Sequence, residues 1–321
     1  MRRLISVLAL LSACAVTHHP SAPAELPAAT MSAAEADLIP LLNTPGPIRH
    51  SVHISGRSTA TIDGLLDLNH PNAAGLQNGE ITVVTPVHRL IHPSAGVFVV
   101  NTGFERAMTR GGRGAARGFG LAMLSIQSFE EPLADILNSA GAPLGGVLLT
   151  SVSIHNVLGL RDVPPGTPIY AGANDTSYET PFNAVLWRTV QNTFDDHDPL
   201  RTFAGAGAVR LGPIQEAYDL LGDGSLWALS TPGHTPGAMS YLARTPEGPV
   251  LFTGNTSYTI WGWEHGVASV HGAIDAKANA ASLSALKALA ASLPGLKVYV
   301  GAETDGVGTG VDEARPLPVE D

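Results

Sequence analysis

Residues 148–160 constrain this chain more than any other stretch of its sequence. They read Leu-Leu-Thr-Ser-Val-Ser-Ile-His-Asn-Val-Leu-Gly-Leu: an apolar run, a short polar turn, and then an apolar segment that contains a glycine. This arrangement is typical of a buried strand that passes through a tight loop into a helix. The polar side chains of the turn, Ser151, Ser153, His155 and Asn156, are therefore expected to lie together at the end of a strand.

Four other segments place polar residues at the ends of apolar runs. Residues 97–103 end in Asn-Thr-Gly, and residues 230–237 read Ser-Thr-Pro-Gly-His-Thr-Pro-Gly. Residues 251–255 end in Thr-Gly-Asn, and residues 298–303 end in Gly-Ala-Glu. Binding and catalytic side chains are disproportionately found on such loops, so these segments and the polar turn indicate one site.

In their order and spacing, the five segments resemble those of the metallo-β-lactamase superfamily, over roughly residues 85–303. The resemblance implies an α/β fold, specifically an αββα four-layer metallo-β-lactamase-type sandwich in which two mixed sheets are flanked by helices. The order of the predicted elements favours the same architecture, because long strands come first and alternating strands and helices follow.

Nine strands and three helices are predicted from the periodicity of the sequence. The strands are expected at residues 50–54, 81–91, 97–100, 146–150, 168–171, 226–230, 239–243, 249–253 and 297–300. The helices are expected at residues 133–137, 173–194 and 275–293. The last helix has the clearest pattern, because its leucines share one side, Asp275 can cap its start, and Pro294 and Gly295 end it.

The resemblance also implies seven metal-ligand positions, since the family holds two metal ions with residues from these segments. Its turn reads His-x-His-x-Asp-His, and further ligands come from the His of Thr-Pro-Gly-His-Thr-Pro-Gly, from Thr-Gly-Asp and from Pro-Gly-His. In this chain the seven positions hold Ser151, Ser153, His155, Asn156, His234, Asn255 and Ala302. Only His234 keeps the family's residue type, so the set is interpreted as a vestigial metal site.

The chemistry of the seven residues predicts a metal-free pocket. Catalytic zinc sites take three protein donors, whereas the serines are neutral hydroxyls, Asn255 lacks charge and Ala302 has no donor. Without a metal, bound water keeps its ordinary acidity and supplies no hydroxide nucleophile. The first hypothesis is therefore a non-hydrolytic pseudoenzyme or small-molecule-binding protein that needs no cofactor.

Two enzymatic alternatives stay open. One is a metal-dependent hydrolase of an ester, lactone or amide-like substrate, in which His155 and His234 bind zinc with help from another donor. The candidates for that donor are Glu303, His265 and His271. The other alternative is metal-free catalysis in which Ser151 or Ser153 is the nucleophile and His155 the base.

The N-terminus is predicted to target the chain to the bacterial cell envelope. Residues 1–13 combine two arginines with a short apolar run, as lipoprotein-type signal peptides do, and Cys14 follows a small-residue site at which lipidation is expected. Residues 14–48, rich in Ala and Pro, are expected to be a tether, with a short helix at 31–42. Residues 49–321 are then the metallo-β-lactamase-like domain, on the periplasmic or outer-membrane face.

Charge limits the partners that the domain can have. The formal net charge is −10, and removal of Arg2 and Arg3 with the signal would bring it to −12, which disfavours nucleic acid. The expected partners are the membrane, through the lipid anchor, and a small-molecule ligand. Four arginines form the one basic cluster, which is either a solvated loop or a contact for an anionic ligand or lipid headgroup. They are Arg106, Arg110, Arg113 and Arg117.

Overall fold

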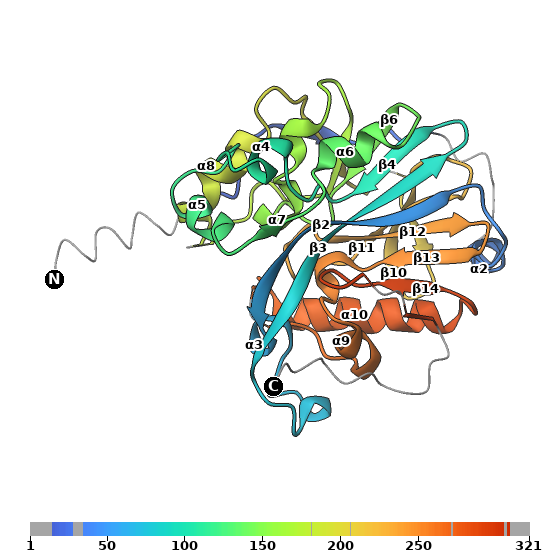
Figure 1. Ribbon diagram of the computed structural model, residues 1–321. Helices are drawn as coiled ribbons and strands as arrows, with labels where there is room; N and C mark the ends of the chain where they lie inside the picture. Colours follow the sequence, from blue (N-terminus) through green and yellow to red (C-terminus); the bar gives the residue numbers. More distant parts are fainter. Residues whose placement is uncertain are drawn as a thin grey trace.

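The chain folds around two mixed β-sheets that pack face to face with helices on both outer sides (Figure 1). The computed structural model describes residues 15–27, 35–180, 182–205, 207–270, 272–304 and 307–308. One sheet has eight strands in the order β1-β8-β7-β6-β4-β3-β2-β5, and the other has seven in the order β15-β14-β13-β12-β11-β10-β9. The predicted αββα sandwich is confirmed.

The strands of the eight-stranded sheet are β1 (Ser21–Pro23), β2 (Arg49–Thr61), β3 (Glu80–His92), β4 (Gly96–Val100), β5 (Ser128–Phe129), β6 (Leu144–Leu148), β7 (Ile169–Gly172) and β8 (Leu200–Phe203). The strands of the seven-stranded sheet are β9 (Val209–Leu211), β10 (Ile214–Asp219), β11 (Leu226–Ser230), β12 (Met239–Thr245), β13 (Gly248–Phe252), β14 (Lys297–Tyr299) and β15 (Val307–Gly308). All nine predicted strands are present, most of them with ends within two residues of the prediction.

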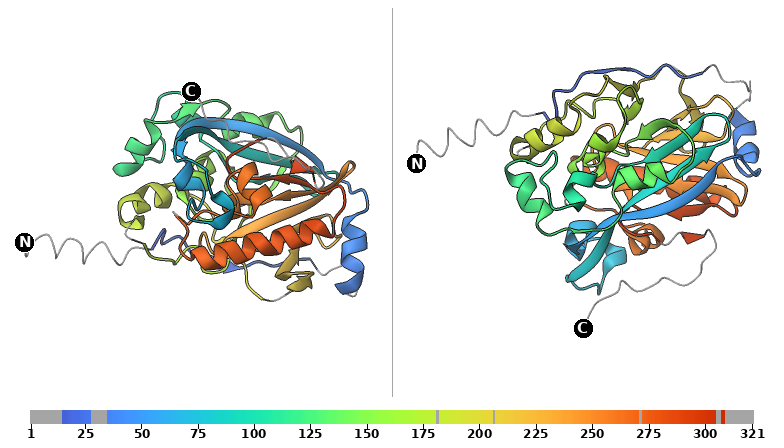
Figure 2. Two further views of the ribbon diagram at one scale, coloured as in Figure 1. Left: turned by 90° about the horizontal axis from the view of Figure 1, so that it is seen from below. Right: turned by 45° about the horizontal axis from the view of Figure 1, so that its top comes forward.

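The described helices are α2 (Glu35–Leu42), α3 (Ile62–Leu65), α4 (Arg106–Thr109), α5 (Phe119–Leu124), α6 (Leu133–Asn138), α7 (Ile154–Val157), α8 (Asn183–Thr193), α9 (Ile260–His265) and α10 (Ala276–Ala291). Short 3-10 turns are η1 (Pro71–Ala73), η2 (Leu160–Asp162) and η3 (Gly254–Thr256). Helices α4 to α8 cover the eight-stranded sheet, and α9 and α10 cover the other (Figures 1 and 2). None of the helices in these residues is both long and apolar enough for a bilayer crossing.

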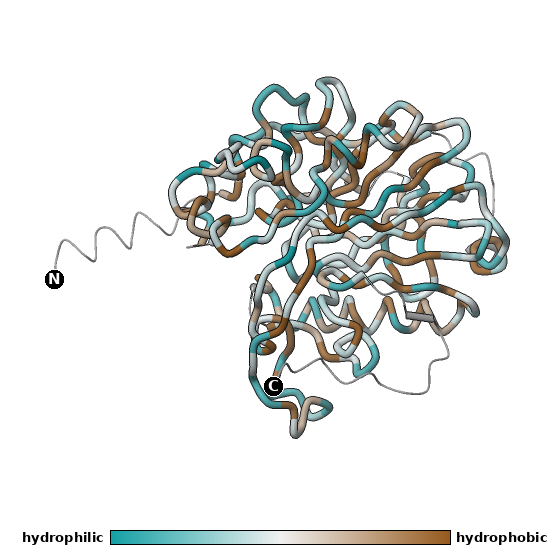
Figure 3. The backbone as a smooth tube through the Cα atoms, in the orientation of Figure 1, coloured by the Kyte–Doolittle hydropathy of each residue, from teal (hydrophilic) through white to brown (hydrophobic). Residues whose placement is uncertain are grey.

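Three apolar layers hold the sandwich together. Between the sheets, side chains such as Leu148 of β6 pack against Tyr241 and Phe252 of β12 and β13. The outer face of the first sheet buries Leu133 and Leu186 from the helices, and the outer face of the second buries Leu286 of α10. Burial of apolar surface in these layers is the main stabilising contribution, and hydrophobic segments recur along the strands of both sheets (Figure 3).

The helix predicted at 173–194 is wrong in its first half, because α8 begins only at Asn183. Asn174 has φ of 65°, a conformation that a helix does not contain. The carboxylate of Asp175 is buried and accepts backbone N–H groups of Val152 and Gly237. These long-range hydrogen bonds fix residues 172–178 as a turn.

The tether predicted for residues 14–48 is wrong for the segments around β1 and α2. Strand β1 pairs in parallel with β8, and Val16 is only 2% exposed in the core beneath the helices. The short helix expected at 31–42 is present as α2, whose Leu42 is fully buried against the second sheet. Residues 1–14, with the predicted signal peptide and Cys14, and residues 28–34 lie outside the described part of the chain.

Candidate functional site

The ends of β4, β6 and β13 bring the predicted site residues to one edge of the sandwich. Asn101 follows β4 with φ of 57°, a conformation that asparagine tolerates better than most residues. Its Oδ1 accepts the Thr150 backbone N–H at 2.9 Å, which joins the loop after β6 to the end of β4. Gly254 lies against that loop from β13, and a Cβ on it would come within 2.4 Å of the Thr150 Cβ.

Asn255 is the centre of a hydrogen-bonded cluster, which we call the Asn255 cluster. Its Oδ1 accepts Asn156 Nδ2 at 2.8 Å and the hydroxyls of Thr150 and Ser151 at 3.2 Å each. The Ser151 hydroxyl is also 3.1 Å from the Ser153 hydroxyl. Thr150, Ser151, Asn156 and Asn255 are all buried, so these hydrogen bonds replace the water that each group loses.

Tyr258 connects the Asn255 cluster to His234. The tyrosine hydroxyl accepts Asn255 Nδ2 at 3.0 Å and lies 3.4 Å from His234 Nδ1. Burial raises the pKa of Tyr258 to about 12, so the phenol is neutral at physiological pH. Burial also lowers the pKa of His234 to about 4, with a smaller contribution from the nearby His155 charge. The contact between the loop that contains Asn255 and the loop that contains His234 is therefore made by uncharged groups.

The remaining predicted residues lie at the border of this cluster. His155 is exposed on the first turn of α7, while Ala302 is buried and its backbone N–H donates to the Tyr258 carbonyl at 2.9 Å. Five of the seven positions, all except His155 and Ala302, are thus joined by hydrogen bonds, directly or through Tyr258.

The additional donors considered for a rebuilt metal site lie elsewhere or make other contacts. His265 stacks on the Trp261 ring with centroids 4.0 Å apart, and its Nδ1 is 2.9 Å from the Trp261 carbonyl. Glu303 accepts the Ile260 backbone N–H at 3.3 Å. His271 is outside the described residues.

Asp175 and Tyr258 are site residues that the sequence did not single out. Asp175 holds the loop that contains His234 against the loop that contains Ser151, through Gly237 and Val152. Burial raises the pKa of Asp175 to about 6, although the backbone hydrogen bonds oppose the shift. Neither residue stands in a recognisable motif, and an aspartate three positions after a strand is an ordinary turn residue in a sequence.

The donor set was tested against the two-metal site that the family resemblance implies. Within the described residues, no three His, Cys, Asp or Glu side chains are grouped so that they could hold a metal ion. The Asn255 oxygen already accepts an N–H and two O–H groups, and such donors oppose a cation at the same atom. The described residues of the site do not fit the two-metal centre that the resemblance implies.

Comparison with solved structures identifies the fold. A quorum-quenching N-acyl homoserine lactone lactonase superposes with a TM-score of 0.57 and 16% identity, covering 81% of this chain and 94% of that chain. The hydrolase AbOPH of the β-lactamase superfamily superposes with a TM-score of 0.53 and 14% identity, covering 81% of this chain and 88% of that chain. This chain has the metallo-β-lactamase fold.

Sequence comparison adds short matches to lactonases and gamma-lactamases. No family model matches the chain. The N-acyl homoserine lactonase AttM of Agrobacterium fabrum is 38% identical over 76 residues, which is 19% of this chain and 29% of the lactonase. The gamma-lactamase FDB1 of Fusarium pseudograminearum is 50% identical over 50 residues, 16% of this chain and 12% of that protein. The chain therefore spans less than a third of either relative.

Proposed function

We propose that the Asn255 cluster binds a small lactone-, ester- or amide-like molecule through neutral hydrogen bonds. The observation that carries the proposal is the cluster itself: uncharged donors and acceptors are hydrogen-bonded to one another at positions where the family resemblance implies metal ligands. The class of ligand is suggested by the relatives, whose names describe lactonases and gamma-lactamases.

The chemistry of the cluster suits a carbonyl compound. Tyr258 is half-buried, and its neutral hydroxyl can turn to donate to a carbonyl oxygen. His234 stays neutral, so its Nδ1 can accept a hydrogen bond from an amide N–H or a hydroxyl of the ligand. The exposed His155 on α7 would contact the part of the ligand nearest to solvent.

Hydrolysis is the second candidate function, and the comparisons favour it over binding alone. The relatives are lactonases and lactamases, and the superposed structures are hydrolases. A metal-dependent hydrolase would have to complete its donor set around His155 and His234 with groups beyond the Asn255 cluster. The serine-based alternative has less support, since no hydrogen bond joins His155 to Ser151 or Ser153 in the described residues.

Two measurements together distinguish binding from hydrolysis: the zinc content of the protein, and whether the bound compound is recovered intact. Protein purified without chelator would be analysed for zinc by mass spectrometry. It would then be titrated calorimetrically with N-acyl homoserine lactones and γ-lactams, and the compounds recovered for analysis. We expect substoichiometric zinc and binding of an unhydrolysed compound, weakened about tenfold by Tyr258→Phe if one hydrogen bond of about 1.4 kcal/mol is lost. One or two zinc ions per chain, with turnover abolished by chelator, would instead establish the hydrolase.

A variant with the family's donor types is the matched control for the metal measurement. It combines Ser151→His, Ser153→His, His155→Asp, Asn156→His, Asn255→Asp and Ala302→His. We expect this variant to bind zinc while the natural chain does not, because the change restores the donors that the resemblance assigns to the two metal ions.

A further inference from the structure

Exposed apolar side chains gather on one face of the molecule, formed by α5, the residues after it, and the start of α8. Among the described residues, seven large apolar side chains are strongly exposed, and five of them belong to this face. The five are Phe119, Leu121, Ile126, Phe182 and Val185, which are 41–62% exposed. The Phe119 and Phe182 rings contact each other at 6.0 Å between centroids. Clustered exposed apolar groups mark an interaction surface.

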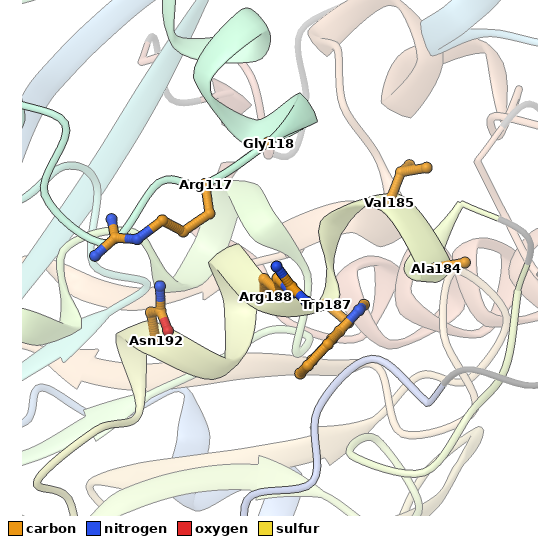
Figure 4. A pocket seen from close by; sticks show the side chains of 7 residues that line it. All are labelled: Arg117, Gly118, Ala184, Val185, Trp187, Arg188 and Asn192. Atoms are coloured by element: carbon orange, nitrogen blue, oxygen red, sulfur yellow. The ribbon is translucent and has the colours of Figure 1, made fainter.

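The same face carries cationic groups in a chain that is otherwise acidic. A cavity of about 690 Å³ opens between the Arg117 loop and α8, and Arg117, Trp187, Arg188 and Asn192 line it (Figure 4). The Arg188 guanidinium lies 5.5 Å from the centre of the Trp187 ring. Arg110 and Arg113 are exposed on the loop that precedes Arg117. The face therefore combines an apolar patch with the guanidinium groups of Arg117 and Arg188.

The start of the described chain is fixed to this face. The Val16 N–H donates to the Tyr178 carbonyl, and Gln191 Oε1 of α8 accepts both the Thr17 hydroxyl and the His18 N–H at 2.8 Å. The His18 ring lies edge-on to Trp187 at 6.2 Å. Ala15 pairs with Glu179. Because consecutive Cα atoms are about 3.8 Å apart, a lipid on Cys14 would be attached next to this pair.

We infer that the α5–α8 face docks on a phospholipid bilayer, so that the protein lies against the membrane instead of extending from it. Phe119, Phe182 and Val185 enter the boundary between headgroups and acyl chains, and Trp187 lies at the headgroup level. Arg117 and Arg188 pair with lipid phosphates, for which guanidinium groups are suited. The inference rests on the apolar and cationic side chains of this face, the predicted lipidation of Cys14 would add to it, and it is independent of the ligand at the Asn255 cluster.

A matched pair of labelled positions tests the orientation. Val185 and Val209 are 42% and 40% exposed, but Val209 belongs to β9 at the far edge of the second sheet. Full-chain, lipidated Val185→Cys and Val209→Cys proteins would be labelled with bimane and reconstituted into phosphatidylcholine vesicles containing brominated lipid, with and without phosphatidylglycerol. We expect quenching at position 185 to be at least threefold stronger than at 209. Equal quenching at the two positions would overturn the inference.

Substitutions on the α5–α8 face distinguish docking by this face from attachment through a lipid on Cys14 alone. Phe119→Ser with Phe182→Ser should abolish the excess quenching at position 185, whereas Ile274→Ser, at an apolar residue exposed elsewhere, should not. Arg188→Glu should lower the quenching most in vesicles with phosphatidylglycerol. Unchanged quenching in the Phe119 and Phe182 double variant, with native circular dichroism, would refute docking.

Mass spectrometry of the N-terminal peptide reports the lipidation independently. Protein without acylated Cys14 that still shows the difference between positions 185 and 209 would support docking by the face itself. Acylated protein without that difference would refute it. Neither result affects lactone binding measured by calorimetry, so failure here is distinguishable from failure of the proposed function.

Discussion

At the scale of the residue, the site is a set of uncharged side chains that satisfy one another. The seven positions were predictable because each follows a recognisable segment, and Asn255 indeed meets Asn156 and Ser151. The central role of Asn255 was not predictable, since its donors come from the segment after β6, which lies 99 to 105 residues earlier in the chain. Asp175 was missed for the same reason: its partners are 23 and 62 residues away.

Truncation of Asn255 should destabilise the protein more than truncation of another cluster residue. Asn255→Ala removes the acceptor shared by the buried Asn156 amide and two hydroxyls, each of which keeps at least one other acceptor, and we expect a loss of about 2 kcal/mol in the free energy of unfolding. Ser153→Ala, at a partly exposed hydroxyl, should cost less than about 1 kcal/mol. Urea denaturation measures both, and similar losses would contradict the central role of Asn255.

Replacement of the Asp175 carboxylate should loosen the contact between the two site loops. In Asp175→Asn, an NH₂ group must face one of the backbone N–H groups of Val152 and Gly237, so one buried donor loses its acceptor. We expect a loss of about 2 kcal/mol in the free energy of unfolding and faster amide exchange at these two N–H groups. Exchange rates that match the natural chain would show that the carboxylate does not hold the loops.

At the scale of the element, the sequence predicted the helices and strands whose determining residues are neighbours in the chain. Helix α10 was predicted because its cap, apolar side and terminator are all adjacent in sequence, and Asp275 does accept the Ala278 N–H at 2.9 Å. Strand β1 was missed because its hydrogen bonds go to β8, which lies about 180 residues away, and an Ala/Pro-rich segment shows no alternation. The composition of 14–48 said nothing about that pairing.

Removal of the α10 cap should have a small, defined effect. Asp275→Ala deprives the Ala278 N–H of its acceptor, and we expect the free energy of unfolding to fall by about 1 kcal/mol. Asp275→Asn keeps an oxygen at the same place and should stay within about 0.5 kcal/mol of the natural chain. Chemical denaturation of the three proteins checks the order, and a reversed order would rule out capping by this side chain.

Truncation near the start of the chain should destabilise the whole domain. Val16 is buried among the helices over the first sheet, so Val16→Ala should cost about 2 kcal/mol. Val209→Ala, at an exposed valine, should change stability by less than about 0.5 kcal/mol. Equal effects in thermal denaturation would mean that residue 16 lies outside the core, as the sequence had suggested for a tether.

At the scale of the whole molecule, two histidines, the buried His88 and the half-buried His50, lie between the two sheets. His50 of β2 and His88 of β3 lie 3.2 Å apart, between Nε2 and Nδ1, and pack against Phe252 and Tyr299 of the other sheet. Burial, followed by the charges of Lys297 and His53, lowers the pKa of His50 to about 4. Burial and then His50 lower the pKa of His88 well below its usual value.

The histidine pair should make the sandwich sensitive to acid. A histidine whose pKa is lowered by folding stabilises the native state above about pH 6.5, and this contribution is lost as the pH falls toward 4. His50→Phe removes one such group. The free energy of unfolding of the variant minus that of the natural chain should therefore be about 2 kcal/mol higher at pH 4 than at pH 7. Denaturation curves at several pH values measure this difference, and a constant difference would contradict it.

The pairing of β1 with β8 has a mechanical consequence once Cys14 carries a lipid. Residues 15–20 lie between the anchor and this edge strand and are themselves bonded to Tyr178 and Gln191, so a pull on the lipid would load those hydrogen bonds first and then the hydrogen bonds of β1. Lifting the body away from the bilayer would then require β1 to peel off β8 and expose an unpaired edge. Attachment and folding stability would thus be coupled through residues 15–23.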